Sequence, residues 1–265
     1  MTTPALDPQI LHFYSERYAE GQRLTRTPHG QLEFLRTQEL LRRELPNPPA
    51  RLLDVGGGPG VHAQWLTADG HAVTLVDPVP LHVEQAAALG GFSASVGDAR
   101  ALAHDDDSFQ STLLLGPLYH LVEAADRATA LREAARVTQP GGMVAVAAIS
   151  RHAGILDMTA DGSLDDAAVC RWAALLGTGR HHDDPHGFTN AYFHHSDELV
   201  DEMRTAGLKK VRVYGVEGPA WTLLDHVPVE RVADLLPAAL RAARLLESDE
   251  RIVAASAHFL AFGEA

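Results

Sequence analysis

The sequence predicts an α/β protein in which a mostly parallel sheet carries helices on both faces. Three observations predict this fold class. Short apolar runs alternate with amphipathic helical patterns between residues 51 and 149, as parallel strands joined by helical crossovers require. A glycine-rich turn at 56–60 follows the first run, and Asp77 and Asp98 each stand at the end of a later run. Acids in that position line the ligand-binding edge of a parallel sheet.

Two amphipathic helices precede the sheet. Apolar residues at helical spacing predict them over 7–20 and 30–45. The prolines of 46–49 end the second helix and form a stiff linker. We therefore expect residues 1–49 to form N-terminal cap helices and residues 50–265 to form the main domain.

The main domain begins with the alternating patterns. Strands are predicted near 51–55, 72–76, 92–96, 110–115 and 143–149. Helices are predicted near 60–69, 80–89 and 124–137, and a sharp turn at 139–142 before the fifth strand.

Residues 151–195 break this rhythm. They are rich in Gly, Asp and His, and one helix is predicted there, near 164–176. We expect this segment to be a lid insertion over the carboxyl edge of the sheet. Beyond it the patterns predict a helix from Ser196 to about 206, a strand at 208–216 and a helix at 229–247; the tail 252–262 should pair antiparallel with the 208–216 strand.

The glycine spacing indicates which nucleoside the turn can hold. Gly56, Gly58 and Gly60 read G-x-G-x-G. A dinucleotide site has G-x-G-x-x-G, and Val61 occupies the last glycine position of that pattern. The spacing therefore disfavours a nicotinamide-dependent oxidoreductase.

The segment LLDVGGGPG at 52–60 resembles motif I of the class I S-adenosylmethionine (SAM)-dependent methyltransferases. The segments LLGPLYHL at 114–121 and RVTQPGG at 136–142 resemble a bacterial branch of that family that acts on small molecules. The resemblance covers about residues 50–262 and implies a Rossmann-like sheet of seven strands, with SAM as the cofactor. One departure is Gln110, because family members carry Asp after the Phe that opens strand four.

The resemblance also implies a role for each residue of the cofactor site. Asp54 holds the glycine loop or contacts the amino group of SAM, Asp77 accepts both ribose hydroxyls, and Asp98 accepts from the adenine amino group. The remaining contacts are expected from glycines 56, 58 and 60, from Val79 on the adenine face, from the Ala99 amide, from Leu115, and from Tyr14 and Tyr18 closing over the cofactor. The alternative is that the acids cap helices and the tyrosines belong to a core stripe.

His120 is the candidate catalytic residue. It follows the fourth strand, the edge where acceptors bind in this fold, and the pKa of a free histidine near neutrality suits a general base. The alternative is a structural histidine within the 116–121 turn. An O or N acceptor needs a base, whereas a carboxylate, thiolate or carbon acceptor would place less demand on His120.

Composition limits the partners. The formal charge of −13, from 22 basic and 35 acidic residues, disfavours nucleic acid. No apolar run reaches the roughly 20 residues of a membrane helix, and the single cysteine fits a cytoplasmic protein. The histidines of 181–195 lack metal-site spacing, so no metal is expected. The sequence thus predicts a SAM-dependent methyltransferase that transfers a methyl group to an O or N atom of a small molecule; a carbon or carboxylate methyltransferase, an oxidoreductase and a non-catalytic SAM-binding protein are the alternatives.

Overall fold

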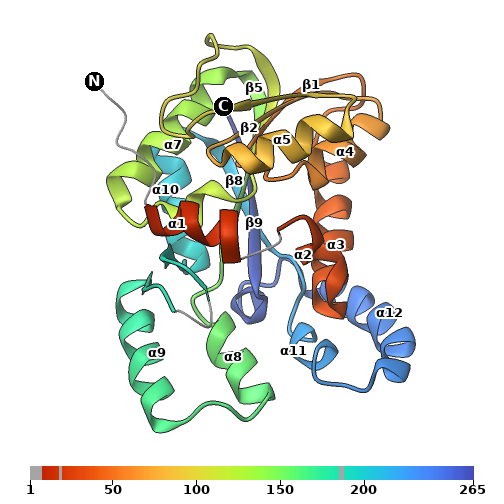
Figure 1. Ribbon diagram of the computed structural model, residues 1–265, viewed down its shortest axis with the longest axis vertical. Helices are drawn as coiled ribbons and strands as arrows, with labels where there is room; N and C mark the ends of the chain where they lie inside the picture. Colours follow the sequence, from red (N-terminus) through yellow and green to blue (C-terminus); the bar gives the residue numbers. More distant parts are fainter. Residues whose placement is uncertain (1–7, 18–19, 185–187) are drawn as a thin grey trace.

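A seven-stranded sheet forms the centre of the computed structural model, which describes residues 8–17, 20–184 and 188–265 (Figure 1). The strand order is β3-β2-β1-β4-β5-β9-β8. The strands are β1 (Arg51–Val55), β2 (Ala72–Asp77), β3 (Ser93–Val96), β4 (Phe109–Leu114), β5 (Thr138–Ile149), β8 (Lys209–Gly215) and β9 (His258–Glu264). The predicted fold class and all seven predicted strands are confirmed.

The first five strands are parallel, and β9 is antiparallel to both of its neighbours, β5 and β8. The chain runs outward through β2 and β3 on one side of β1 and through β4 and β5 on the other. This reversal of strand order opens a crevice at the carboxyl ends of β1 and β4.

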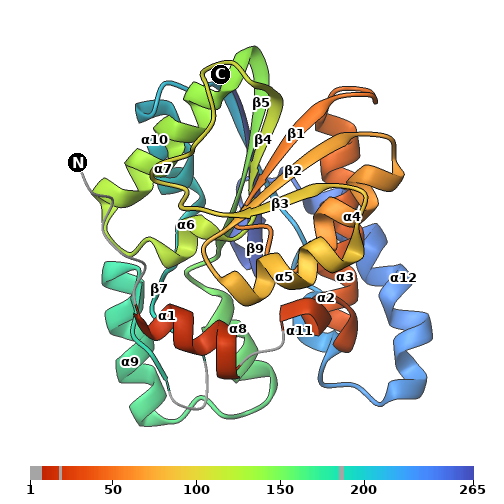
Figure 2. The ribbon, with the colours of Figure 1, turned by 45° about the horizontal axis from the view of Figure 1, so that its top comes forward.

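Helices cover both faces of the sheet, as Figure 2 shows. One face packs against α7 (Ala124–Val137) and α10 (Ser196–Thr205), and the other against α3 (Pro28–Glu44), α4 (Val61–Ala68) and α5 (Pro80–Leu89). Successive strand residues point to opposite faces; Leu53 lies in the first core and Leu52 in the second. Because both faces are buried, the strands are nearly continuous apolar runs, which is why the sequence predicted them well.

The N-terminal segment is more broken than predicted. In place of one helix over 7–20 there are a short helix α1 (Pro8–His12) and a π-helical turn (Phe13–Arg17), followed by a 3-10 turn (Glu20–Gln22) and α2 (Arg23–Arg26). Helix α3 begins at Pro28, two residues before the predicted start, because the Thr27 side chain accepts a hydrogen bond from Gly30 N and Pro28 occupies the first turn.

The insertion holds more structure than predicted. Besides α9 (Asp166–Thr178), it contains α8 (Ala153–Ala160) and a two-stranded hairpin, β6 (Arg180–His181) with β7 (Ala191–Tyr192). The predicted turn at 139–142 is part of β5, where Gly141 takes a φ of +77°.

A short helix, α6 (Pro117–His120), follows β4. The C-terminal part adds α11 (Trp221–Leu224) and α12 (Val229–Leu246), which packs on α3. None of the helices in the described part of the chain is both long and apolar enough to span a bilayer.

Candidate active site

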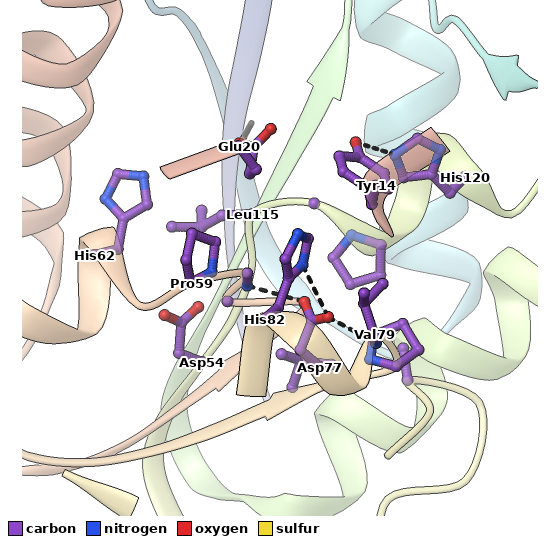
Figure 3. Close-up of a pocket in the computed structure, with 18 of the residues that line it drawn as sticks. Tyr14, Glu20, Asp54, Pro59, His62, Asp77, Val79, His82, Leu115 and His120 are labelled. Atoms are coloured by element: carbon purple, nitrogen blue, oxygen red, sulfur yellow. Dashed lines mark hydrogen bonds and ion pairs between the residues drawn. The ribbon is translucent and has the colours of Figure 1, made fainter. Parts of the chain in front are cut away.

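A pocket lies at the carboxyl ends of β1, β2 and β4, at the reversal point of the sheet (Figure 3). The glycine loop after β1 forms its floor, and the N-terminal segment and the α6 turn close it from above. Its lining includes His120 and nine of the residues predicted for the cofactor: Tyr14, Asp54, Gly56, Gly58, Asp77, Val79, Asp98, Ala99 and Leu115.

The glycine loop needs glycine for two different reasons. Gly56 has a φ of +68°, and a Cβ there would lie 2.6 Å from the Pro117 ring. Gly58 has a φ of +56°, which favours glycine, and a Cβ there would make only ordinary contacts, 3.6 Å from Glu20 Cγ and 4.0 Å from His82 Nδ1. Gly60 does not line the pocket. It precedes α4, and a Cβ there would lie 2.8 Å from the Phe92 ring, so it serves the packing of that helix.

Asp54 is the least satisfied polar group of the pocket. It is fully buried, and neither carboxylate oxygen has a hydrogen-bond partner among the described residues. Burial, and then the nearby charge of Asp77, raise the pKa of Asp54 to about 7. A buried acid without partners is costly, so this carboxylate is suited to receive a cationic group of a ligand.

Asp77 is already bound to its own loop. Its Oδ2 accepts from Gly58 N at 2.9 Å, and its Oδ1 accepts from Val79 N at 2.9 Å and lies 3.2 Å from His82 Nδ1. A carboxylate offers about four lone-pair positions, so one remains on Oδ2. Asp77 thus has room for one ribose hydroxyl, and a second would require His82 to turn away.

The adenine end of the predicted site is only partly available. Asp98 lines the pocket, but its carboxylate is paired with Arg100, whose Nη2 lies 2.6 Å from Oδ2. Val79, Ala99 and Leu115 supply apolar wall.

His120 ends α6 and contacts two segments that lie far away in the sequence. Its Nε2 lies 2.7 Å from the hydroxyl of Tyr14, and its Nδ1 lies 3.4 Å from the carbonyl oxygen of Asn190. A carbonyl only accepts, so Nδ1 carries the hydrogen and Nε2 accepts from Tyr14 in the neutral ring. Burial lowers the pKa of His120 to about 4. The half-buried imidazole is therefore neutral near pH 7, and its lowered pKa makes it a weaker base than a free histidine.

Aromatic rings from three segments cover this end of the pocket. Phe188 of the insertion packs on Phe13, Tyr119 and His120, with ring centroids 5.7, 6.3 and 5.5 Å away. Tyr14 also packs edge-on against His82 at 5.4 Å. Tyr18, predicted to close over the cofactor, lies outside the described residues.

Several polar lining residues were not predicted. Glu20 and Arg23 form a 2.9 Å ion pair at the pocket wall, and Arg23 also binds Glu33 at 2.6 Å. Burial raises the pKa of Glu20 and lowers that of His62 to about 4. These residues lie on short helices with no motif of their own; only His82, in the first helical turn after Asp77, had a sequence signal.

The histidines of the insertion bind other groups. His181 stacks on Phe193 with centroids 5.4 Å apart and lies 3.1 Å from Thr189 O, and His194 lies 3.3 Å from Glu202. No metal-ligand cluster forms among the insertion residues that the structure describes.

Residues 53–146 match the family described as a methyltransferase domain. Within these residues the chain is thus similar to a methyltransferase domain. A methyltransferase of Mycobacterium tuberculosis is 37% identical over 99 residues, which are 37% of this chain and 39% of that protein. Methyltransferase GfsG of Streptomyces halstedii is 31% identical over 154 residues, 54% of this chain and 51% of that protein. The matched part of the chain thus spans about half the length of these relatives or less.

The solved structure of a SAM-dependent methyltransferase from Thermotoga maritima shares the fold of the methyltransferase domain. It is 20% identical, with a TM-score of 0.61 over 96% of this chain and 97% of that one. SAM is the cofactor of this family, and the pocket fits it. The unpartnered Asp54 carboxylate suits the ammonium of SAM, and the glycine loop lines the same pocket.

Proposed function

We propose that this protein transfers a methyl group from SAM to an O or N atom of a small molecule. The observation that carries the proposal is the buried, unpartnered carboxylate of Asp54 beside the glycine loop and Asp77, in a pocket that His120 also lines. The acids and the loop match a cationic nucleoside, and the histidine stands where an acceptor would lose a proton.

When bound, SAM supplies a methyl group on a positively charged sulfur. The protein's part is alignment, which alone can contribute effective molarities of about 10⁵–10⁸ M. Asp54 holds the amino group of the cofactor and Asp77 holds its ribose, and the aromatic cover excludes water. His120 Nε2 takes the acceptor proton once the Tyr14 hydroxyl yields its place.

A small acceptor is favoured because the pocket is covered from three directions. Tyr14, Phe188 and Tyr119 meet over it. The net charge of −13 works against a nucleic acid acceptor. The neutral state of His120 supports an acceptor that must lose a proton, and thus O or N over a carboxylate.

The test is turnover of methyl-labelled SAM by the full chain with fractionated small-molecule extracts. We expect S-adenosylhomocysteine to form together with a labelled product, and NAD not to compete. SAM binding without product in any fraction would indicate a non-catalytic SAM-binding protein, and NAD binding without SAM binding would overturn the proposal. A labelled product that releases methanol in mild base would identify a carboxylate acceptor.

A further inference from the structure

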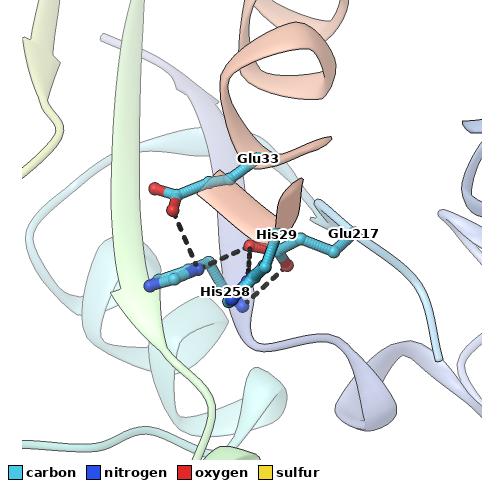
Figure 4. A group of neighbouring side chains, drawn as sticks. All are labelled: His29, Glu33, Glu217 and His258. Atoms are coloured by element: carbon cyan, nitrogen blue, oxygen red, sulfur yellow. Dashed lines mark hydrogen bonds and ion pairs between the residues drawn. The ribbon is translucent and has the colours of Figure 1, made fainter. Parts of the chain in front are cut away.

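Four ligand-type side chains meet outside the pocket (Figure 4). His29 and Glu33 are on the first two turns of α3, Glu217 follows β8, and His258 begins β9. One ligand atom from each lies within 4.8 Å of all the others. None of the four lines the pocket described above.

Their spacing is close to that of one coordination sphere. His29 Nε2 lies 3.6 Å from Oε1 of Glu217, and His258 Nδ1 lies 3.8 Å from Oε2 of Glu33. Tetrahedral ligands about 2.0–2.2 Å from a zinc ion are about 3.3–3.6 Å apart. The third contact, 2.6 Å between His258 Nδ1 and Glu217 Oε1, is a hydrogen bond that an ion would replace.

His29 points to a ligand most directly. Its Nε2 is buried and has no hydrogen-bond partner among the described residues. The opposite nitrogen, Nδ1, lies 3.7 Å from Oδ2 of Asp225. A carboxylate behind a histidine is how proteins orient metal-binding imidazoles. Trp221 packs against the same ring at a tilt of 36°, with centroids 4.7 Å apart, and restricts its orientation.

The two carboxylates are held from behind in the same way. Oε2 of Glu217 accepts from Ser256 Oγ at 2.7 Å and from His258 N at 3.0 Å, which leaves Oε1 facing the cluster. Glu33 is held by both terminal nitrogens of Arg23, at 2.6 and 2.9 Å, and each oxygen keeps a second lone pair. Two carboxylates and one guanidinium leave a charge of −1, which suits a divalent cation.

We propose that His29, Glu33, Glu217 and His258 bind a divalent first-row transition ion, with Zn²⁺ preferred. Two imidazoles and two carboxylates in a near-tetrahedral arrangement match that ion. The ion would join the start of α3 to the β8 and β9 ends of the sheet. A proton on His258 competes for the same position.

The first experiment measures binding of Zn²⁺ alone to chelator-treated full-length protein. We expect one tight equivalent per chain. Loss of a group that hydrogen-bonds a metal ligand lowers metal affinity by about 10–100-fold. Loss of a ligand itself, in His29→Ala or Glu217→Gln, should therefore lower it by at least ~100-fold. His182→Ala is the matched control, since His182 is an exposed histidine outside the cluster and should bind as wild type does. Equal Zn²⁺ affinity of wild type and His29→Ala overturns the proposal. So does the absence of a tightly bound Zn²⁺, because the cluster would then hold only a proton on His258.

A second measurement does not depend on how the ligand variants fold. Co²⁺ in the cluster should quench the fluorescence of Trp221, which packs against His29. Trp172 lies near His181, with centroids 6.3 Å apart, and would report ions bound by the insertion histidines. Quenching should persist in Trp172→Phe and disappear in Trp221→Phe; the reverse pattern contradicts the proposal.

Discussion

The hydroxyl of Tyr14 lies 2.7 Å from Nε2 of His120, although 106 residues separate them. The carbonyl of Asn190 fixes the other side of the same ring. The N-terminal segment and the insertion therefore meet at the histidine that we propose as the base. Because the Tyr14 hydroxyl occupies the lone pair of Nε2, proton transfer requires this contact to open, so entry of the acceptor and activation of the base are the same event.

Removing the imidazole tests whether it is that base. His120→Ala should lower turnover by about 10²–10⁴-fold at saturating acceptor, with little change in SAM affinity, since His120 is not among the predicted cofactor contacts. Near-normal turnover would make His120 a wall residue. Tyr14→Phe is the matched variant: it removes the hydroxyl and keeps the ring, so it should lose much less activity than His120→Ala.

The pH profile tests the environment of His120. Its pKa is lowered to about 4, so the imidazole remains neutral, and competent as a base, until the pH falls through that value. Between pH 8 and about 5.5, protonation of His120 should therefore cause no loss of turnover. The pH profiles of wild type and His120→Ala should have the same shape over this range. Circular dichroism at each pH controls for unfolding. An acid limb near pH 6.5 that disappears in His120→Ala would show that the ring is solvated in the working enzyme.

Asp54 should make stability depend on pH. Burial raises its folded-state pKa from the ordinary value of 3.8 to about 7. The folded state therefore binds more protons than the unfolded state between these values, and the contribution of Asp54 to stability falls as pH rises from about 4 to 7. Three pKa units correspond to roughly 4 kcal/mol as an upper limit. Urea unfolding at pH 5, 6, 7 and 8 measures the free energy of unfolding of Asp54→Asn and of wild type. The value for the variant minus the value for wild type should rise with pH and level off above pH 7. A flat difference would mean that Asp54 is hydrated.

Asp77 should matter more for SAM affinity than Asp98. In Asp77→Asn the amide nitrogen would face the Gly58 or Val79 N–H, which are both donors, so the loop and the ribose contact are lost together. A lost charge-assisted hydrogen bond is worth about 1.5–3 kcal/mol, or roughly 10–100-fold in affinity by calorimetry. Asp98→Asn should cost less, because Arg100 already occupies its carboxylate. The reverse ranking would show that the adenine contact dominates.

The sheet and the glycine loop were readable from the sequence because their causes are local. Parallel strands buried on both faces are apolar runs, and Gly56 and Asp77 stand directly at strand ends. The contact of Tyr14 with His120, and the cluster of His29 with Glu217, join segments 106 and 188 residues apart in the sequence. No local pattern encodes them, and they emerge only from the packing of the caps on the sheet.

The insertion was the least predictable part. Helix α8 has eight residues and a glycine near its start, so its apolar period is weak, and the strands of the β6–β7 hairpin have two residues each. The pairing of Asp98 with Arg100 was missed for another reason. Arg100 lies only two residues after Asp98, but the resemblance implies an adenine contact for Asp98 and no ion pair within the chain.

Two glycines of the insertion provide a matched test of its packing. Gly154 on α8 lies against Trp172 of α9, and a Cβ there would be 1.9 Å from the indole ring. Gly154→Ala should therefore destabilise the protein by about 1–3 kcal/mol, as overpacking does. Gly177 on α9 has nothing within 4 Å of its Cβ position, so Gly177→Ala should stabilise by roughly 0.5–1 kcal/mol through helix propensity alone. Urea unfolding and hydrogen exchange across 153–178 would measure both effects. If Gly154→Ala is as stable as wild type, α8 does not pack on α9 as described, and the aromatic cover of the pocket would then stand without this support.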